Sequence, residues 1–362
     1  MSTINIQQKR FLGSLSLLLL FVSSSMELTG FEPLPEVSPE VSYVRFDTTP
    51  VNYEALEGSE RFLLPSDTAN KWRLNVEVLN WNIKRSDLDF AGSSDQTTLA
   101  IGRGTIHQIQ FDENQGFRGL LAFKTKSDWE LGVRYTSYGN DSFSSLDVND
   151  LDGTTIFSTR SHSKVNEEAE TVVGYASFYM NSFDFEARKQ IVHSDNSTFE
   201  VFGGLRWGEF DQVLQVEYDG HDFNQGEIDN KVNSNAFGLF LGGAGSWNLG
   251  QSGYYASFEG NAALLTADKT VSILETELGA SDVDVIVDVQ NEYDHLLPTA
   301  AFRLGAGYRT DKLDICLSYE ITGIFNLADR LVYQDDIHES IFSHSISDVT
   351  LEGLTFRLQY RF

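Results

Sequence analysis

The chain has 362 residues, of which 41% are hydrophobic and 22% charged, and its 26 Lys and Arg against 53 Asp and Glu give a formal net charge of -27. The hydrophobic content excludes a disordered chain, and the acidity argues against partners held through phosphates, so no nucleic-acid partner is expected. The single cysteine, Cys316, excludes an intramolecular disulfide framework and a zinc site built on several thiolates.

The N-terminus has the composition of a secretory signal peptide. A basic pair, Lys9 and Arg10, precedes an apolar stretch at residues 11–22, which three serines follow. This stretch is shorter than the roughly 20 residues that a membrane-spanning helix needs, which favours a cleaved signal over an uncleaved anchor. We therefore predict a signal peptide at residues 1–25 and an exported mature chain. Residues 26–70 contain several prolines and acids without a sustained period, and we predict a periplasmic N-terminal extension there.

Residues 71–362 are dominated by period-2 alternation, which is typical of strands with two different faces. In the clearest stretch one face carries Trp129, Leu131, Val133 and Tyr135, and the other carries Glu130, Gly132, Arg134 and Thr136. Similar runs joined by tight turns predict four hairpins, at 117–135, 183–207, 237–264 and 302–321. A first strand near 71–83 and a last one at 354–362 bring the total to about ten strands.

These strands predict an all-β fold, a closed antiparallel transmembrane β-barrel at 71–362, because in hydrocarbon every backbone N–H and C=O must be paired internally. An even strand number places both termini and the short turns on the periplasmic side. The long extracellular connections are then expected near 84–115, 139–170, 211–234, 267–296 and 325–349, where much of the acidity lies. Between eight and fourteen strands fit other loop assignments. A soluble secreted all-β protein is the alternative fold.

Aromatic residues mark the ends of the apolar runs and the end of the chain. Rings settle at the headgroup level of a membrane, which suits Trp129, Tyr135, Trp207, Trp247, Tyr254 and Tyr308. The last strand alternates up to Phe362 and looks like the terminal strand of Gram-negative outer-membrane proteins, which the barrel-assembly machinery recognises. Leu358, Tyr360 and Phe362 are therefore the predicted assembly signal. The expected partners are outer-membrane lipid and that machinery.

Three short motifs carry a resemblance to a family. They are FDFEAR at 183–188, FEVFGGLRW at 199–207 and LFLGGAG at 239–245. Together they resemble the barrel core of the Legionella-type major outer membrane protein and of related planctomycete barrel porins. The resemblance covers residues 71–362 and implies an outer-membrane barrel with a porin-like or structural surface role. It transfers no catalytic residue.

The alternation also predicts which charged side chains face the lumen. The lumen-facing candidates are Arg118, Lys124, Arg134, Asp184, Glu186, Arg188, Glu200, Arg206, Glu259, Arg303, Arg309, Glu320, Arg357 and Arg361. They either line an aqueous pore or pair with one another and fill it, since about eight strands leave room only for side chains and sixteen to eighteen leave a channel. The acidic mouth favours cations if the pore conducts.

Motifs for catalysis or tight metal binding are not evident. His338 and His344 lack the spacing that places two imidazoles on one helical face. The acidic stretch 147–153 departs from a calcium loop, because Val148 stands where the first ligand belongs and Thr159 where the bidentate Glu belongs. We therefore expect no catalytic residue, cofactor or metal site. Divalent cations at the acidic loops stay open as partners.

The function that this pattern favours is a porin-like passive channel in the outer membrane for small solutes, with cation preference. The alternative is a non-conducting structural or surface-interaction barrel that acts through its acidic extracellular loops. Ten-stranded outer-membrane proteases offer an enzymatic alternative, because the loops hold acids and the histidines His162, His221, His295, His338 and His344. Without a defined spacing among these residues, we expect no enzyme.

Overall fold

The computed structural model describes residues 72–95, 104–151, 154–162, 168–194, 196–250, 252–279, 282–333 and 341–362. All of them belong to one compact unit, Leu63–Phe362. The predicted signal peptide and most of the predicted N-terminal extension fall in the other unit, Met1–Phe62, and both lie outside the described residues. Among the described residues no helix is long and apolar enough to cross a membrane.

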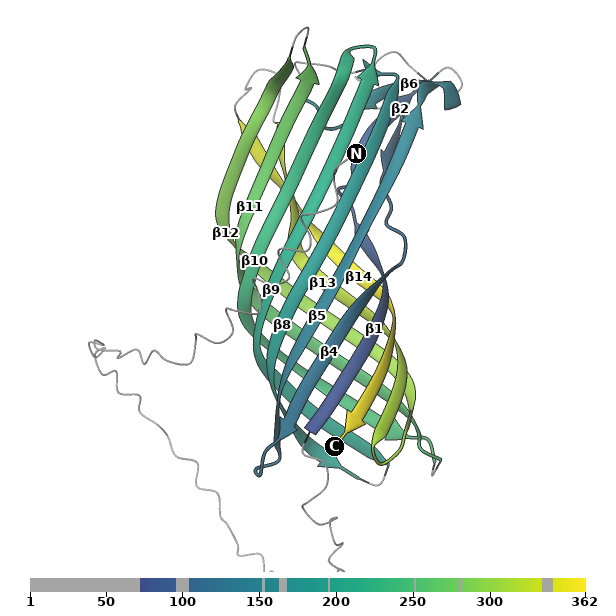
Figure 1. Cartoon of the computed structure of the whole chain (residues 1–362), viewed down its shortest axis with the longest axis vertical. Coiled ribbons are helices and arrows are strands. Elements are labelled where there is room, and N and C mark those ends of the chain that lie inside the picture. Colours follow the sequence, from purple (N-terminus) through teal and green to yellow (C-terminus); the bar gives the residue numbers. More distant parts are fainter. Residues whose placement is uncertain are drawn as a thin grey trace, which may run out of the picture. The chain divides into compact units, whose positions relative to one another are not determined.

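Ten strands form a closed antiparallel barrel, as the alternation predicted (Figure 1). In ring order they are β1 (Trp72–Arg85), β14 (Phe342–Arg361), β13 (Leu313–Tyr333), β12 (Val283–Arg309), β11 (Tyr254–Leu278), β10 (Phe223–Asn248), β9 (Ser197–Gly220), β8 (Thr171–His193), β5 (Trp129–Asp147) and β4 (Asn114–Lys124). The ring closes because β1 pairs with β14 on one side and with β4 on the other.

A second, smaller sheet of four short strands belongs to two of the connections. Its order is β3 (Thr105–Gln108), β2 (Asp89–Ser94), β6 (Thr155–Ser158) and β7 (Glu168–Ala169). In the sequence, β2 and β3 lie in the connection from β1 to β4, and β6 and β7 lie in the connection from β5 to β8. Ile156 and Phe157 of β6 are 0% and 3% exposed. These two connections are therefore folded and packed.

The half of the barrel that holds the last residue has apolar outward side chains and charged inward ones. Phe185, Leu239 and Leu304 are 45%, 66% and 55% exposed, whereas Glu186 and Arg303 are 3% and 8% exposed. A water-soluble protein has the opposite arrangement, with its large apolar side chains buried. The outward face of this half therefore fits the hydrocarbon of a membrane.

An aromatic row limits this apolar band on the side away from the last residue. Tyr135, Phe183, Trp207 and Phe237 are successive cross-strand partners on β5, β8, β9 and β10. The ring centroids of Tyr135 and Phe183 lie 4.7 Å apart, and those of Phe183 and Trp207 lie 5.9 Å apart. At the other limit lie Trp72, Trp129, Trp247, Tyr254, Tyr308 and Tyr360. Two aromatic girdles with an apolar band between them are typical of a transmembrane barrel.

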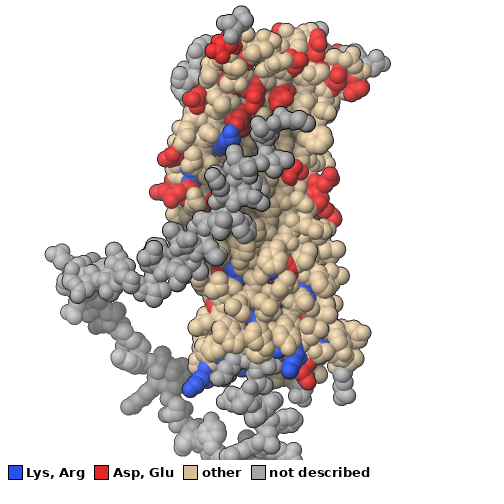
Figure 2. Space-filling view, viewed as in Figure 1, with Lys and Arg blue, Asp and Glu red and all other residues tan. Residues whose placement is uncertain are grey.

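Beyond the aromatic row the polarity of the two faces reverses while the alternation continues. On β9, the inward Leu214 and Val216 are 2% and 0% exposed, and the outward Glu217 is exposed. Figure 2 shows acidic side chains spread over this half of the visible surface. The expected loops at 211–234 and 267–296 lie almost wholly in strands, so those loop predictions were wrong. The part of a barrel wall that lies in water carries acidic residues on its outer face. Its amino-acid composition is therefore similar to that of a loop.

The strands are consequently much longer than a membrane requires. The five strands from β8 to β12 contain 23 to 27 residues, whereas about 9–11 tilted residues cross the hydrocarbon. At about 3.3 Å per residue, more than half of each strand stands outside the bilayer. Two of the outer connections are consequently short. One joins β9, which ends at Gly220, to β10, which begins at Phe223. The other joins β11, which ends at Leu278, to β12, which begins at Val283.

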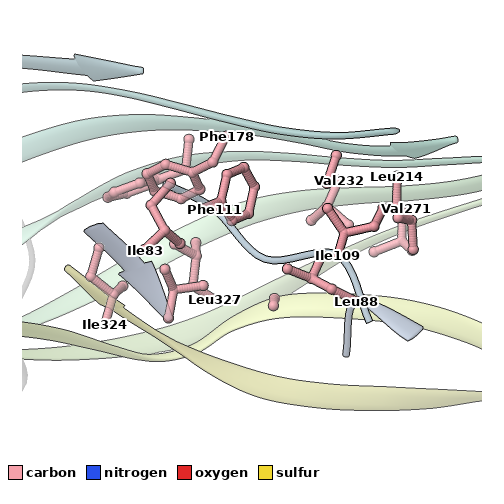
Figure 3. Packing of buried hydrophobic residues seen from close by; sticks show 14 of the residues in the cluster. Ile83, Leu88, Ile109, Phe111, Phe178, Leu214, Val232, Val271, Ile324 and Leu327 are labelled. Carbon is pink, nitrogen blue, oxygen red and sulfur yellow. The ribbon is translucent and has the colours of Figure 1, made fainter. Parts of the chain in front are cut away.

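The connection between β1 and β4 fills the water-exposed half of the barrel. We call its described residues, 86–95 and 104–113, the plug. Leu88, Phe90, Ile109 and Phe111 are between 2% and 5% exposed, and the Tyr218 hydroxyl on β9 donates to the Phe90 carbonyl at 2.6 Å. Figure 3 shows Leu88, Ile109 and Phe111 among apolar side chains of the barrel strands, which include Phe178, Leu214, Val232 and Val271. The sequence placed this segment outside the barrel, which was wrong.

The part of the β13–β14 hairpin that lies in the water-exposed half also bends into the lumen. We call its described residues, 325–333 and 341–348, the inner hairpin. Asn326 has a φ of 60°, and the β13–β14 register shifts between Ile324 and Ala328. The Lys269 ammonium of β11 donates to the Asn326 carbonyl at 2.7 Å, and the Gln212 amide of β9 donates to the Leu327 carbonyl at 3.3 Å. The inner hairpin therefore lies against the inner wall instead of extending it.

Tryptophan fluorescence can check this orientation. In single-tryptophan variants refolded into bilayers, we expect brominated acyl chains to quench Trp207 and Trp247 strongly. Trp81, which is 1% exposed and donates to the Thr355 hydroxyl inside the barrel at 3.3 Å, should retain most of its emission. Strong quenching of Trp81 would contradict the inward orientation of β1.

Candidate functional site in the barrel lumen

The lumen of the membrane-spanning half contains a continuous chain of ion pairs. Glu320 accepts two hydrogen bonds of 2.9 Å from Arg118, which also donates to Glu77 at 3.0 Å. Arg303 then links Glu77, at 2.9 Å, with Glu259, at 3.1 Å. All five side chains are at most 12% exposed. Their charges are therefore neutralised inside the barrel by one another.

The chain of ion pairs continues through the strands on the opposite wall. Arg134 lies 3.4 Å from Glu259 and 2.9 Å from Glu186. Arg188 lies 3.5 Å from Glu186 and donates to Glu200 at 3.0 Å. Because Arg134 is on β5 and Glu259 is on β11, four steps apart in the ring, their pair crosses the lumen. Side chains therefore block the passage at this level.

Aromatic rings of the inner wall pack against several of these charged groups. The guanidinium groups of Arg188 and Arg206 lie 4.3 Å and 5.0 Å from the ring centroids of Phe202 and Phe240. Arg118 lies 5.2 Å from the ring of Trp81. Such contacts stabilise a cation out of water. We call the ion-paired residues of the lumen, from Glu320 to Glu200, the ionic layer; aromatic rings lie among its charges.

The structure places the predicted lumen-facing residues together, with one exception. Arg118, Arg134, Asp184, Glu186, Arg188, Glu200, Arg206, Glu259, Arg303, Arg309, Glu320, Arg357 and Arg361 are all buried or partly buried on inward positions. Lys124 is the last residue of β4, and its 56% exposed side chain pairs with Asp128 in the following turn. The predicted assembly residues Leu358, Tyr360 and Phe362 point outward and are 41%, 43% and 52% exposed.

Several members of the ionic layer were not predicted from the sequence. Arg73 and Glu77 lie inward on β1, where the spacing Arg73, Asn75, Glu77 was the available signal. Asp314 accepts a hydrogen bond from Arg309 at 2.7 Å and lies 3.7 Å from Arg357. Its position on the inner face was evident from the alternation.

Two cavities found among the described residues of the membrane-spanning half are both small. One, of about 20 Å³, is lined by Glu77, Arg118 and Arg303 among others. The second, of about 60 Å³, lies between the ionic layer and apolar residues that include Phe210 and Leu265. Since one water needs about 10–15 Å³ by this measure, these cavities hold single waters or small clusters. Neither has the dimensions of a solute channel.

Ion pairs also tie the plug to the barrel wall. Asp89 of the plug lies 2.9 Å from Arg160 and 3.3 Å from Arg330 of β13. Asp87 pairs with Arg85, whose guanidinium also donates to Gln212 on β9 at 2.8 Å. Burial lowers the pKa of Arg160 to about 10, and the nearby Asp89 opposes that shift. These contacts hold the first residues of the plug against β1, β13 and the segment that follows β6.

A second group of polar residues lies where the inner hairpin meets β11 and β12. Asp329 of β13 is 1% exposed; it accepts a hydrogen bond from Tyr293, and its Oδ2 lies 3.1 Å from His344 Nδ1. The His344 Nε2 atom lies 2.9 Å from the Asn291 amide. Lys269 lies 4.0 Å from Asp329, and burial lowers the lysine pKa to about 8.

Glu275 connects three parts of the molecule near the outer end of the barrel. Its carboxylate accepts hydrogen bonds from the His162 backbone N–H at 3.0 and 3.2 Å and from the Tyr333 hydroxyl at 3.1 Å. The residue is 2% exposed. Burial raises the pKa of Glu275 to about 7, although both hydrogen bonds act in the opposite direction. Its charge therefore changes near neutral pH.

The described residues contain no group of three or more His, Cys, Asp or Glu arranged to hold a metal ion. In the acidic stretch 147–153, Asp147 caps a short 3₁₀ helix, Val148–Asp150, by accepting a hydrogen bond from the Asn149 N–H at 2.8 Å. Asp152, Gly153 and His338 lie outside the described residues.

A closed ring of antiparallel strands with an apolar outer band, two aromatic girdles and a charged interior defines an integral outer-membrane β-barrel. Residues 64–362 match the family model described as Legionella pneumophila major outer membrane protein precursor. The chain belongs to this family, as the short motifs at 183–188, 199–207 and 239–245 indicated, and it is located in the outer membrane.

Solved structures with a similar chain trace are also outer-membrane barrels. The outer membrane protease OmpT from Escherichia coli aligns at 11% identity and a TM-score of 0.44, covering 83% of this chain and 99% of that one. A Pseudomonas aeruginosa FadL homologue aligns at 9% identity and a TM-score of 0.26, covering 82% and 91%. The translocator domain of the autotransporter NalP from Neisseria meningitidis aligns at 9% and 0.31, covering 81% and 89%. No curated protein sequence matches the chain.

Proposed function

We propose that this barrel is closed to solutes and acts at the cell surface through the half that stands above the membrane. The observation that carries the proposal is the chain of ion pairs from Glu320 to Glu200, which crosses the lumen within the membrane-spanning half. Passage of a solute would require breaking several buried ion pairs, and each broken pair leaves an uncompensated charge that costs about 3–5 kcal/mol. The plug adds a second, apolar barrier in series.

The proposed role is non-enzymatic and depends on the acidic outer wall as a rigid interaction surface. Strands, unlike loops, hold their side chains at fixed spacings of about 7 Å along one face. A strand-built wall therefore presents acids such as Glu217, Glu227 and Asp288 in a defined pattern. Its proposed partners include outer-membrane lipid, the barrel-assembly machinery, which would read Leu358, Tyr360 and Phe362, and cationic groups at the acidic wall.

The competing function is a porin-like channel for small solutes with cation preference. It requires the ionic layer and the plug to move together, because each blocks the lumen at a different level. The two functions differ in one measurable property, which is the conductance of the folded protein.

Planar-bilayer recording of the refolded mature chain separates them. For a closed barrel we expect no conductance steps above the lipid background when heat-modifiable gel migration shows that the same preparation is folded. Stable steps with cation-selective reversal potentials in a salt gradient would overturn the proposal and establish the channel. A general porin reconstituted in the same lipid provides the positive control.

A further inference from the structure

The wall of the water-exposed half is interrupted beside β12. In the membrane-spanning half β12 pairs with β13 from Thr299↔Ile324 to Arg309↔Asp314. Above this level the inner hairpin turns into the lumen, and residues 283–298 pair with β11 on one side. Among the described residues, no strand pairs with their other side. Residues 283–298 thus form a free strand edge outside the membrane, which we call the β12 edge.

Pro298 marks the start of this edge. It lies opposite Leu264 of β11 and directly precedes the first β12–β13 pair. Proline has no N–H to donate, so within sheets it is confined to edges, strand ends and bulges. Its position here agrees with a strand that has lost one neighbour.

Side chains, and not backbone, connect the β12 edge to the inner hairpin. The Tyr293 hydroxyl donates to Asp329, and the Asn291 amide lies 2.9 Å from His344 Nε2. These two residues hold the inner hairpin behind β12. Among the described residues, no strand and no backbone–backbone hydrogen bond occupies the side of residues 286–298 that faces away from β11. A free strand edge is a template on which an extended chain can add.

The chemistry of the outward face selects the kind of chain that fits. Asp288, Glu292 and Asp294 are exposed on the outward side of the β12 edge. A hydrogen bond with Asp294 raises the pKa of Asp268 on the neighbouring β11, as expected where carboxylates crowd together. A second copy of this edge would bring equal rows of acids together, which is unfavourable. An extended segment with alternating cationic side chains would instead pair each lysine or arginine with a carboxylate.

We propose that the β12 edge binds a basic, extended peptide segment of a partner by strand addition. This inference rests on the proposed surface role and names the chemical class of the partner. Backbone hydrogen bonds to residues 283–298 supply the attachment, and the acids on the outward face supply the charge selection. Exposed Val283 and Val285, at 55% and 61%, offer apolar contact at the outer end.

A synthetic peptide with alternating lysine and threonine tests the proposal on the full mature barrel in nanodiscs. We expect saturable binding that weakens with salt and that disappears when alternate peptide amides are N-methylated, since N-methylation keeps the charge but removes the hydrogen bonds. The double variant Asp288→Lys and Glu292→Lys should weaken binding by about tenfold or more. A glutamate-for-lysine peptide should not bind.

The matched control is Glu217→Lys with Glu227→Lys. These two residues are cross-strand partners on β9 and β10, which are both paired on their two sides. The control makes the same charge change away from any edge and should alter affinity by no more than about twofold. Equal losses in the two variants, or equal binding by the N-methylated peptide, would reduce the site to unspecific charge attraction and overturn the proposal.

Two further outcomes have defined meanings. Absence of binding by the unmethylated peptide, or a stable dimer of the chain without peptide, would also overturn it, the latter by showing that a second copy already covers the edge. The conductance experiment is independent of this one. A barrel that conducts but binds the peptide refutes the closed lumen and leaves the strand-addition site intact.

Discussion

Replacing Arg303 with alanine should lower the free energy of unfolding of the barrel by about 3–5 kcal/mol. The side chain is 10% exposed and joins Glu77 to Glu259, so its removal leaves two buried carboxylates with fewer partners. Glu77 retains Arg118 at 3.0 Å, and Glu259 retains Arg134 at 3.4 Å. The penalty comes from the uncompensated charge and from the desolvation that the arginine no longer offsets.

Urea unfolding of the barrel in lipid vesicles, followed by heat-modifiable migration, measures this loss. Lys124→Ala provides the control, because the Lys124–Asp128 pair has side chains that are 56% and 77% exposed. Such a pair contributes little, so its loss should change stability by less than about 1 kcal/mol. Similar small losses in both variants would mean that the ionic layer is hydrated and loosely paired, and the proposed barrier to solutes would fail with it.

The outer end of the barrel should become less stable as the pH rises from about 4.5 to about 7, because of Glu275. Burial raises the pKa of this group from 4.5 to about 7 in the folded protein. The stabilising contribution is complete below the unfolded pKa and is lost as the pH rises through the folded one. The shift corresponds to about 3 kcal/mol. Ionisation of Glu275 therefore costs desolvation free energy where β11, Tyr333 and the segment at His162 meet, and it favours local opening of that region.

Glu275→Gln should remove most of this pH dependence and keep the hydrogen bonds from Tyr333 and His162. Thermal unfolding at pH 5 and pH 7.5, with protease sensitivity of the inner hairpin as a local readout, measures the difference. The exposed Asp288→Asn is the control and should leave the wild-type pH dependence in place. If the wild type and Glu275→Gln lose stability equally between these pH values, another group is responsible.

The membrane-spanning strands could be predicted from sequence because lipid and lumen impose opposite demands on adjacent residues. The inward positions of Arg118, Arg303 and Glu320 followed directly from that alternation. The first strand was harder because it crosses the level where polarity reverses. Its outward residues change from Val78 to Asn80, and its inward residues change from Glu77 to the fully buried Leu79. Because the apolar side chains switch from the outward to the inward face within this strand, one period-2 pattern does not fit its whole length.

The arrangement above the membrane depends on contacts that are remote in the sequence. The acids on the outward faces of β9 to β12 have the composition of loops, although Leu214, Val216, Val271 and Ile273 show the inward period of strands. The plug lies in the lumen because its apolar residues pack against this inner wall. Local sequence patterns could not predict that packing. The inward bend at Asn326 likewise depends on partners from β9 and β11, which are Gln212 and Lys269.

The reversal of polarity beyond the aromatic row fixes how deeply the barrel sits in the bilayer. Sinking by one residue pair would carry the outward Glu209 and Asp294 into the interface, and rising by the same amount would expose residues such as Leu296 to water. The barrel therefore cannot shift along the bilayer normal to accommodate a mismatch. Lipids whose acyl chains are too long or too short for the apolar band must instead change the local bilayer thickness. The lipids next to this barrel would then be the ones whose chain length matches the band between its two rows of rings.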